Sequence, residues 1–261
     1  MRIGVIGLGT VGSAIKTGLE GSHEILVHDT KFDTTIDDVT ESVDFVFVCV
    51  PTPTILDSGE CDTSIVESVL EQMPEGTRIV IKSTVIPGTT QKLQESFPKL
   101  RIACSPEFLR SATSIEDFQN QDIMVIGTQH QDLAESVIES HVQAGVVERS
   151  SCFVVSPTQA ELVKYAKNSF YSMKVIFANQ LYDYCEDLNE DWSKVKEIIT
   201  KPQTQPIGDS HLDAISGMSR GFGGGCLPKD TLALNEDMKR RGIEYRLLEA
   251  VLEDNNRLRR S

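Results

Sequence analysis

The chain has 261 residues, of which 39% are hydrophobic and 25% are charged, fractions typical of a folded globular protein with one or two domains. Its formal net charge is −14, which argues against a nucleic-acid or anionic-membrane partner because both bind basic surfaces. No apolar run is long enough to span a membrane. The first expected strand starts almost at Met1, so we expect no signal peptide.

The cysteines are scattered along the chain, show no C-x-x-C spacing and do not cluster with histidines. This pattern does not indicate a zinc site, so we expect no metal cofactor. Cysteines outside a disulfide framework fit a reducing compartment, and we therefore expect a cytoplasmic protein. Cys49 and Cys104 end apolar runs and are expected in the core.

Apolar runs typical of buried strands alternate with helical stretches through the first half of the chain. The expected strands are Arg2–Ile6, Glu24–His28, Asp44–Val50, Arg78–Lys82, Arg101–Cys104 and Asp122–Gly127. The expected helices are Thr10–Leu19, Ser64–Met73, Thr89–Phe97 and Gln131–Gln143. This alternation predicts an α/β fold with a doubly wound, Rossmann-type parallel sheet in residues 1–150.

The first strand leads into Gly7, Gly9 and Gly12, which have the G-x-G-x-x-G spacing of dinucleotide-binding loops. These glycines permit a tight turn and close approach to a pyrophosphate at a helix N-terminus. Asp29 ends the second strand at the position of the acid that holds the adenosine ribose hydroxyls. Its charge should repel a 2′-phosphate, so the motif favours NAD over NADP, while the nearby Lys31 keeps NADP open as an alternative.

The second half of the chain is mainly helical. Ser156, Pro157 and Gln159 form a helix start with an N-cap serine and a capping-box glutamine. Apolar residues then recur in steps of three and four from Leu162 to Leu188, which predicts one long helix with a continuous buried stripe. Shorter helices are expected at Trp192–Thr200, Asp230–Arg240 and Tyr245–Arg260. We therefore expect a helical domain in residues 151–261, joined to the first domain by the long helix.

Polar segments follow three expected strands, at residues 51–53, 83–85 and 105–110. Ligands of open α/β sheets bind at the carboxyl ends of the strands, so these segments are expected to share a cleft with the glycine loop. Glu107 is placed to act as a base or to orient water, and Thr84 offers an uncharged hydroxyl. For any one segment alone, an ordinary turn is the simpler interpretation.

Lys164 and Asn168 lie four residues apart on the long helix and share one face. A solvated helix face is the simplest interpretation. The alternative is that this face looks into the cleft, where an ammonium and an amide would stabilise negative charge developing on a substrate oxygen.

The stretch from Gly221 to Asp230 places Cys226 after a run of glycines and directly before a helix start at Pro228. A thiol at a helix N-terminus beside Lys229 ionises more readily than a free thiol, which favours a nucleophilic cysteine. A flexible loop with an incidental cysteine is the other interpretation.

Together these residues resemble the nucleotide-sugar dehydrogenase family, specifically UDP-glucose 6-dehydrogenases and their GDP-mannose relatives. The segments that carry the resemblance are, in order, GLGTVG, VPTP, KSTVIPGTT, SPEFLR, AELVKYAKNSF and GFGGGCLPKD. The family oxidises a sugar C6 alcohol to a carboxylate in two NAD-dependent steps, and the resemblance implies that activity here. It implies that Cys226 captures the aldehyde as a thiohemiacetal, which a second hydride transfer converts into a thioester for hydrolysis.

The same resemblance implies roles for further residues. Lys164 and Asn168 would bind substrate, Asp230 and Thr84 would position water, and Glu107 would serve thioester hydrolysis. Substrate contacts are implied for Phe108, Leu109, Arg110, Gly223, Gly224 and Gly225. Cofactor contacts beyond the three glycines and Asp29 are implied for Thr10, Val11, Lys31, Pro51, Thr52, Thr84 and Lys229.

The chain departs from the family pattern in two places. Ser111 stands where many relatives carry a second glutamate after the SPEFLR segment. The chain also stops at Ser261, where relatives continue into a third domain that closes over the nucleotide, so we expect that domain to be absent and the nucleotide contacts weaker. The long helix and the segment 211–213 resemble regions that form a dimer in relatives, and we expect a homodimer.

Three alternatives remain. The chain could oxidise another nucleotide sugar, such as GDP-mannose or a UDP-N-acetylhexosamine, because those relatives share the cysteine and the glycine loop. It could resemble the β-hydroxyacid dehydrogenases, which need no thiol, although Cys226 speaks against them. It could also be a truncated, non-catalytic NAD-binding module.

Overall fold

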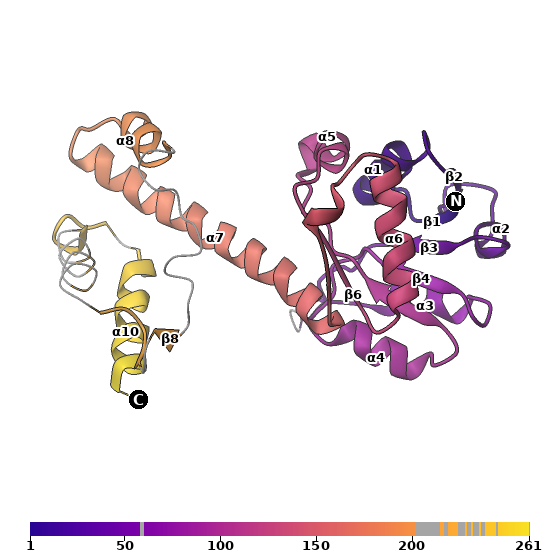
Figure 1. The fold of residues 1–261 in the computed structure, drawn as a ribbon. Coiled ribbons are helices and arrows are strands. Elements are labelled where there is room, and N and C mark those ends of the chain that lie inside the picture. Colours follow the sequence, from indigo (N-terminus) through magenta and orange to yellow (C-terminus); the bar gives the residue numbers. More distant parts are fainter. Residues whose placement is uncertain are drawn as a thin grey trace. The chain divides into compact units, whose positions relative to one another are not determined.

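The computed structural model describes residues 1–57, 60–201, 215–216, 219–223, 228, 231, 235, 238–243 and 245–260. The chain separates into two compact units, Met1–Asn168 and Ser169–Ser261, called here the N-terminal and C-terminal units. Helix α7, Pro157–Asp187, contributes residues to both (Figure 1). Each unit is described by itself.

The N-terminal unit is built on a seven-stranded sheet with the order β2-β1-β3-β4-β5-β6-β7. Its strands are β1 Arg2–Ile6, β2 Glu24–His28, β3 Phe45–Val48, β4 Arg78–Ile81, β5 Arg101–Cys104, β6 Met124–Thr128 and β7 Cys152–Val155. All neighbours pair in parallel except β5 and β6. The α/β fold class expected from the sequence is confirmed, whereas an entirely parallel sheet is wrong by one pair and β7 was not expected.

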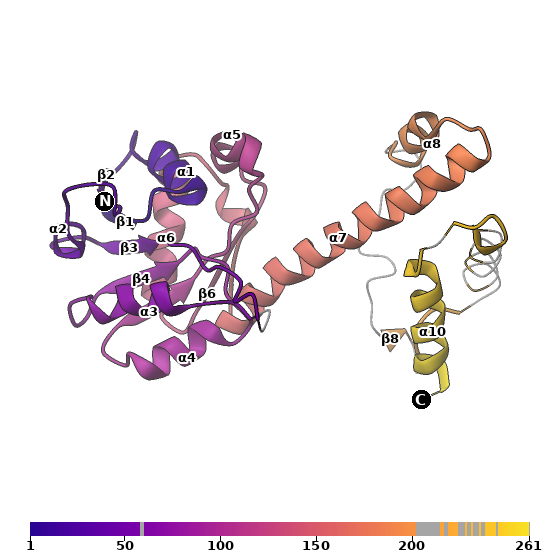
Figure 2. The same cartoon turned by 180° about the vertical axis from the view of Figure 1, so that it is seen from behind.

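The helices of this unit include α1 Thr10–Leu19, α2 Ile36–Thr40, α3 Ser64–Glu71, α4 Thr89–Ser96, α5 Ser114–Gln119 and α6 Gln131–Gln143. Four of them were expected within two residues; α2 and α5 were not. Alternate side chains of the central strands point to opposite faces. Thus Phe45 and Phe47 join α1, α5 and α6 in one core cluster, while Val46 and Val48 join α2, α3 and α4 in another. Figure 2 shows these helices around the sheet.

The antiparallel step in the sheet decides where α7 begins. Cys104, the last residue of β5, pairs with Gly127 of β6, and Gly127 pairs in turn with Val155 of β7. The end of β7 therefore lies level with the carboxyl end of β5. Pro157 opens α7 directly above this edge, and its carbonyl lies 3.5 Å from Cys104 Sγ.

The capping box expected at the start of α7 is confirmed. The backbone N–H of Ser156 donates to Gln159 Oε1 at 3.0 Å, and the N–H of Gln159 donates to Ser156 Oγ at 3.3 Å. The expectation of a continuous buried stripe along α7 is wrong for the single chain, because Leu162 is 50% exposed and Met173 49% exposed. A helical period shows that apolar residues share a face, but not that this chain covers that face.

The C-terminal unit is mainly helical in its described part. It holds the later part of α7, α8 Trp192–Ile199 and α10 Leu247–Arg260, with a two-stranded antiparallel pair of β8 Ile215–Ser216 and β9 Ser219–Arg220. An Arg241–Asp187 ion pair and a Tyr245–Asp183 hydrogen bond at 2.7 Å tie the segment before α10 to α7. The expected helix at 230–240 lies largely outside the described residues.

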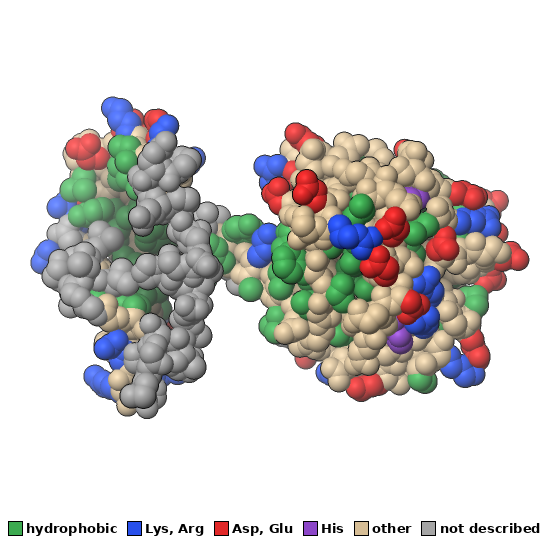
Figure 3. All heavy atoms as spheres, viewed as in Figure 1, with side chains coloured by type: hydrophobic (Ala, Val, Ile, Leu, Met, Phe, Trp, Pro, Cys, Tyr) green, Lys and Arg blue, Asp and Glu red, His purple; other side chains and the backbone are tan. Residues whose placement is uncertain are grey.

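Charged side chains of both signs are spread over the face of the N-terminal unit that Figure 3 shows. Among the described residues, no helix combines the length and apolar character that crossing a membrane requires.

Candidate active site

The loop between β1 and α1 needs glycine at two positions for different reasons. Gly7 has φ +90°, and a Cβ there would lie 2.8 Å from the carbonyl oxygen of Cys49. A Cβ on Gly12 would lie 1.9 Å from the carbonyl oxygen of Gly7. Only glycine lets the strand turn this sharply into the helix.

Gly9, by contrast, has no heavy atom within 4 Å of the place where a Cβ would stand. It is the N-cap of α1 and gives the helix no side-chain cap, and the first turn carries no acidic residue. No side chain therefore caps the backbone N–H groups of Thr10 and Val11 in the first turn of α1, and the positive end of this helix faces open space. A pyrophosphate fits this cradle, which is the arrangement that dinucleotide-binding loops use.

Asp29 lies beside this loop, directly after β2. Its carboxylate accepts the backbone N–H of Leu8 at 2.8 Å and the backbone N–H of Lys31 at 3.1 Å. These two hydrogen bonds hold the pKa of Asp29 below its ordinary value. The acid is therefore a fixed anion at the mouth of the loop, suited to accept hydrogen bonds from ribose hydroxyls.

An open pocket of about 810 Å³ joins these features, a volume in the range of small-molecule sites. Of the residues predicted to contact the cofactor, those that line it are Gly7, Gly9, Asp29, Lys31 and Pro51. The side chains of Ile6, Ile36 and Val69 give it apolar walls. The residues present fit a dinucleotide. Among the described residues, no group of three or more His, Cys, Asp or Glu side chains is placed to hold a metal ion.

The turns after β3 and β4 are tied together at the same edge of the sheet. Thr52 Oγ1 donates to the carbonyl oxygen of Thr84 at 2.7 Å, and Ser83 Oγ donates to that of Val50 at 2.6 Å. The Cys61 thiol lies 3.7 Å from the same Thr84 oxygen. Two of the three polar segments expected to share a cleft are thus in direct contact.

The third segment, after β5, contains a charged pair that the sequence did not reveal. Lys82, the residue directly after β4, forms an ion pair with Glu107, and both side chains are buried. Lys82 also donates to Ser105 Oγ at 3.1 Å. One sequence signal could have indicated this ion pair. Lys82 directly follows the apolar run of β4, and a lysine buried at the end of such a run requires a partner of opposite charge. The Glu107 carboxylate points inward to Lys82 in this structure.

Lys164 of α7 reaches the same segment. Its ammonium donates to the backbone carbonyl of Glu107 at 2.6 Å and lies 5.8 Å from the centroid of the Phe108 ring. Burial lowers the pKa of Lys164, the carboxylate of Glu107 opposes that shift, and Lys167 adds to it. The Lys164 face of α7 is therefore turned toward the polar segment after β5, and Asn168, one turn on, is exposed.

Two other residues predicted to contact substrate have local partners. Leu109 packs against the core cluster of α1, α5 and α6. Arg110 is exposed and forms an ion pair with Asp117, which also accepts the Arg110 backbone N–H at 2.8 Å. These contacts stabilise the turn into α5, and a substrate contact of either residue stays a prediction.

The glycine loop around the predicted nucleophile is described only in part. Gly223 lies in the C-terminal unit, where a Cβ would come within 2.4 Å of Arg259 Nη1. The adjacent Phe222 N–H donates to Asn255 Oδ1 at 2.7 Å. Five predicted site residues and one predicted dimer segment lie outside the described residues, namely Gly224, Gly225, Cys226, Lys229, Asp230 and 211–213.

The fold and the glycine cradle define an α/β dinucleotide-binding protein with a helical second part. Residues 17–144 match the NAD binding domain of the UDP-glucose/GDP-mannose dehydrogenase family, and residues 158–257 match its central domain. The chain belongs to this family.

Similar proteins of known name agree with this assignment. A UDP-glucose 6-dehydrogenase of Rickettsia felis is 34% identical over 86% of this chain and 50% of its own length. One of Haloferax volcanii is 35% identical over 82% of this chain and 52% of its own length. A crystal structure of a GDP-mannose dehydrogenase from Pseudomonas aeruginosa shares the fold, with a TM-score of 0.86 at 23% identity over 99% of this chain and 69% of its own. The chain spans about half the length of the curated relatives that it matches.

Proposed function

We propose that this protein is an NAD-dependent oxidoreductase that oxidises the C6 alcohol of a nucleotide sugar, converting UDP-glucose to UDP-glucuronate. The observation that carries the proposal is the placement of Lys164. Its ammonium contacts the segment after β5 through the Glu107 carbonyl. That segment follows the carboxyl end of its strand, at the same edge of the sheet where β1 leads into the glycine loop. The relatives of 34% and 35% identity are named UDP-glucose 6-dehydrogenase, which favours UDP-glucose among nucleotide sugars.

The cofactor site uses the chain's own groups for binding and orientation. The N-terminus of α1 binds the pyrophosphate, and Asp29 accepts hydrogen bonds from the adenosine ribose. NAD, when bound, accepts the hydride removed from the sugar carbon.

The substrate chemistry is assigned to Lys164, Asn168 and Cys226. Lys164 stabilises the oxyanion that develops at C6, and its lowered pKa makes proton transfer to and from that oxygen easier. The thiol of Cys226 adds to the aldehyde carbon, and the resulting thiohemiacetal loses a second hydride to give a thioester. Water then cleaves the thioester, which releases the carboxylate and restores the thiol. Two NAD are reduced for each sugar oxidised.

The test is NADH production by the purified chain with a panel of UDP- and GDP-sugars. We expect two NADH per UDP-glucose consumed, and we expect Cys226→Ala to abolish this stoichiometry. Cys152→Ala is the matched control, because Cys152 lies on β7 away from the proposed site. Binding of NAD without turnover of any sugar, or an unchanged stoichiometry in Cys226→Ala, would contradict the proposal.

We also propose a homodimer through α7, acting in the cytoplasm. Apolar side chains on this helix, including Leu162, Tyr171, Met173 and Phe177, are 39–51% exposed in the single chain. Apolar residues repeated along one helix are a common dimer interface. Light scattering should give a dimer mass for the wild type and a monomer mass for Met173→Glu/Phe177→Glu, and a monomeric wild type would contradict this assignment.

A further inference from the structure

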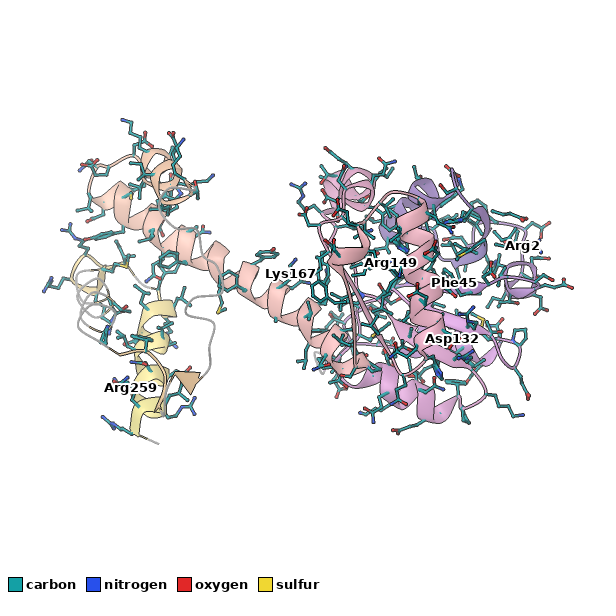
Figure 4. All side chains as sticks on the ribbon, in the orientation of Figure 1. Arg2, Phe45, Asp132, Arg149, Lys167 and Arg259 are labelled. Carbon is teal, nitrogen blue, oxygen red and sulfur yellow. The ribbon has the colours of Figure 1, made fainter. Side chains whose placement is uncertain are left out.

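The ring of Phe108 lies beside two ammonium groups. The Nζ atom of Lys167 is 4.2 Å from the ring centroid, and the Nζ atom of Lys164 is 5.8 Å from it. The two lysines are three residues apart on α7, so they occupy the same side of the helix. Figure 4 labels Lys167 on α7, in the part of the helix that belongs to the N-terminal unit. Two like charges thus share one aromatic surface within the N-terminal unit.

Neither ammonium forms an ion pair with a carboxylate in the part of the chain that the structure describes. Lys164 is held by the backbone carbonyl of Glu107, whose own carboxylate is paired with Lys82. Lys167 contacts the face of the ring, which is favourable but does not neutralise its charge. In a chain of net charge −14, this pair is a local concentration of positive charge.

Two adjacent cations repel each other, and an anion bound beside both removes that cost. Lys167 adds to the lowering of the Lys164 pKa, so the two charges are close enough to influence one another. Three ammonium groups, those of Lys82, Lys164 and Lys167, thus surround the single carboxylate of Glu107, and a ligand can supply a further negative charge.

We propose that Lys167 is a specificity-determining residue that binds the carboxylate formed at C6 of the sugar. This inference rests on the proposed function, in which Lys164 stabilises the oxygen at C6. The substrate is neutral at C6 and the product carries a full negative charge there. A second cation beside Lys164 therefore distinguishes product from substrate at the one position where they differ.

The consequence is a chain that binds its product more tightly than its substrate. A charge-assisted hydrogen bond from Lys167 to one carboxylate oxygen increases product affinity, while the neutral alcohol gains little. The nucleotide part of the two ligands is the same, so its contacts cancel in the comparison.

The test measures binding of UDP, UDP-glucose and UDP-glucuronate to the full chain by titration calorimetry. We expect Lys167→Met to weaken UDP-glucuronate about 5- to 20-fold, while UDP-glucose and UDP change less than about twofold. Lys167→Arg should retain most of the affinity for the product, because it keeps the charge. Lys92→Met, which removes an exposed lysine of α4, is the matched control and should change none of the three.

The other outcomes separate this proposal from the one on which it rests. Equal weakening of all three ligands in Lys167→Met would assign Lys167 to the diphosphate and overturn the carboxylate subsite. No change for any ligand would overturn it as well. Failure of the wild-type chain to bind any of the three would contradict the proposed function itself, and the subsite with it.

Discussion

Lys82 and Glu107 form an ion pair in the interior of the N-terminal unit, with side chains 1% and 8% exposed. Lys82 also lies 5.7 Å from the centroid of the Phe47 ring, inside the core. The backbone oxygen of Glu107 is meanwhile bonded to Lys164. Two lysines therefore hold one residue, one by its carboxylate and the other by its main chain.

We expect Lys82→Met to destabilise the fold by about 3–5 kcal/mol, because the carboxylate of Glu107 would remain buried without a partner. The double variant Lys82→Met/Glu107→Gln should recover much of that loss, since it removes both charges. Urea unfolding of Lys82→Met, Glu107→Gln and the double variant measures the coupling free energy between the two side chains. Additive losses would show that the pair contributes nothing as a pair.

The core strands could be predicted from sequence because each is a short apolar run, and the runs ending at Ile6, His28 and Cys104 were located to the residue. Direction was not encoded in the same way. A buried strand is apolar whichever way it runs, so the antiparallel pairing of β6 depends on the path of residues 105–123. The edge strand β7, with Phe153 50% exposed, gains its stability from pairing with β6, a contact between distant segments.

The candidate site was predictable where its chemistry is local. The glycine spacing and Asp29 belong to one β-α-β unit, formed by β1, α1 and β2, and they line the same pocket. The partner of Glu107 was not predictable, because Lys82 lies 25 residues earlier in the chain and meets it only when β4 pairs with β5. The exposed face of α7 was missed for a similar reason, since burial depends on what packs against a helix.

Gly9 and Gly12 should respond differently to the same substitution. Gly12→Ala forces a methyl group against the Gly7 carbonyl and should destabilise the fold by about 1–3 kcal/mol. Gly9→Ala meets no atom, so its free energy of unfolding should stay within about 0.5 kcal/mol of the wild type. Its NAD affinity should nevertheless fall about tenfold or more, because the methyl group occupies the approach of the pyrophosphate.

Urea unfolding and calorimetric titration with NAD give the two quantities for each variant. Unchanged NAD affinity in Gly9→Ala would contradict the cradle as the pyrophosphate site.

Glu161 of α7 caps the N-terminus of another helix of the N-terminal unit, α4. Its buried carboxylate accepts the backbone N–H of Gly88 at 2.5 Å and that of Thr90 at 2.8 Å, at the start of α4. Gly88, the N-cap, provides no side-chain cap of its own. Glu161→Gln should therefore cost about 1.5–3 kcal/mol, since it replaces a charged acceptor of two hydrogen bonds.

Thermal or urea unfolding measures this cost. Glu95→Gln is the matched control, because Glu95 is exposed on α4, and it should change stability by less than about 0.5 kcal/mol. A cost for Glu161→Gln no greater than that of the control would show that the cap is unimportant.

His141 should make the fold sensitive to acid. It is fully buried, with its ring against Phe47 and Phe118, and its Nδ1–H donates to the Val137 carbonyl at 2.9 Å. Burial, followed by the charge of Lys82, lowers its pKa from 6.5 to about 3. The unfolded chain therefore binds a proton more readily, and the stability linked to this residue is present above pH 6.5 and is lost as the pH falls below it.

The limiting slope is about 1.4 kcal/mol per pH unit between the two pKa values. Unfolding of wild type and His141→Phe across that range should show the difference between them shifting steadily in favour of the variant as the pH falls. A difference independent of pH would mean that His141 can be protonated in the folded protein at little cost.

Gly127 shows how much depends on the smallest side chain in the sheet. A Cβ at this position would lie 2.7 Å from Pro157 Cα, 2.7 Å from Ala160 Cβ and 2.9 Å from Cys104 Sγ, so the first turn of α7 rests on bare main chain of β6. Lys164 lies seven residues after Pro157, about 10 Å along the axis of α7. A larger residue at position 127 would displace the first turn of α7 and break the hydrogen bond from Lys164 Nζ to the carbonyl of Glu107. The position of the Lys164 ammonium above the sheet therefore depends on the absence of a side chain at Gly127.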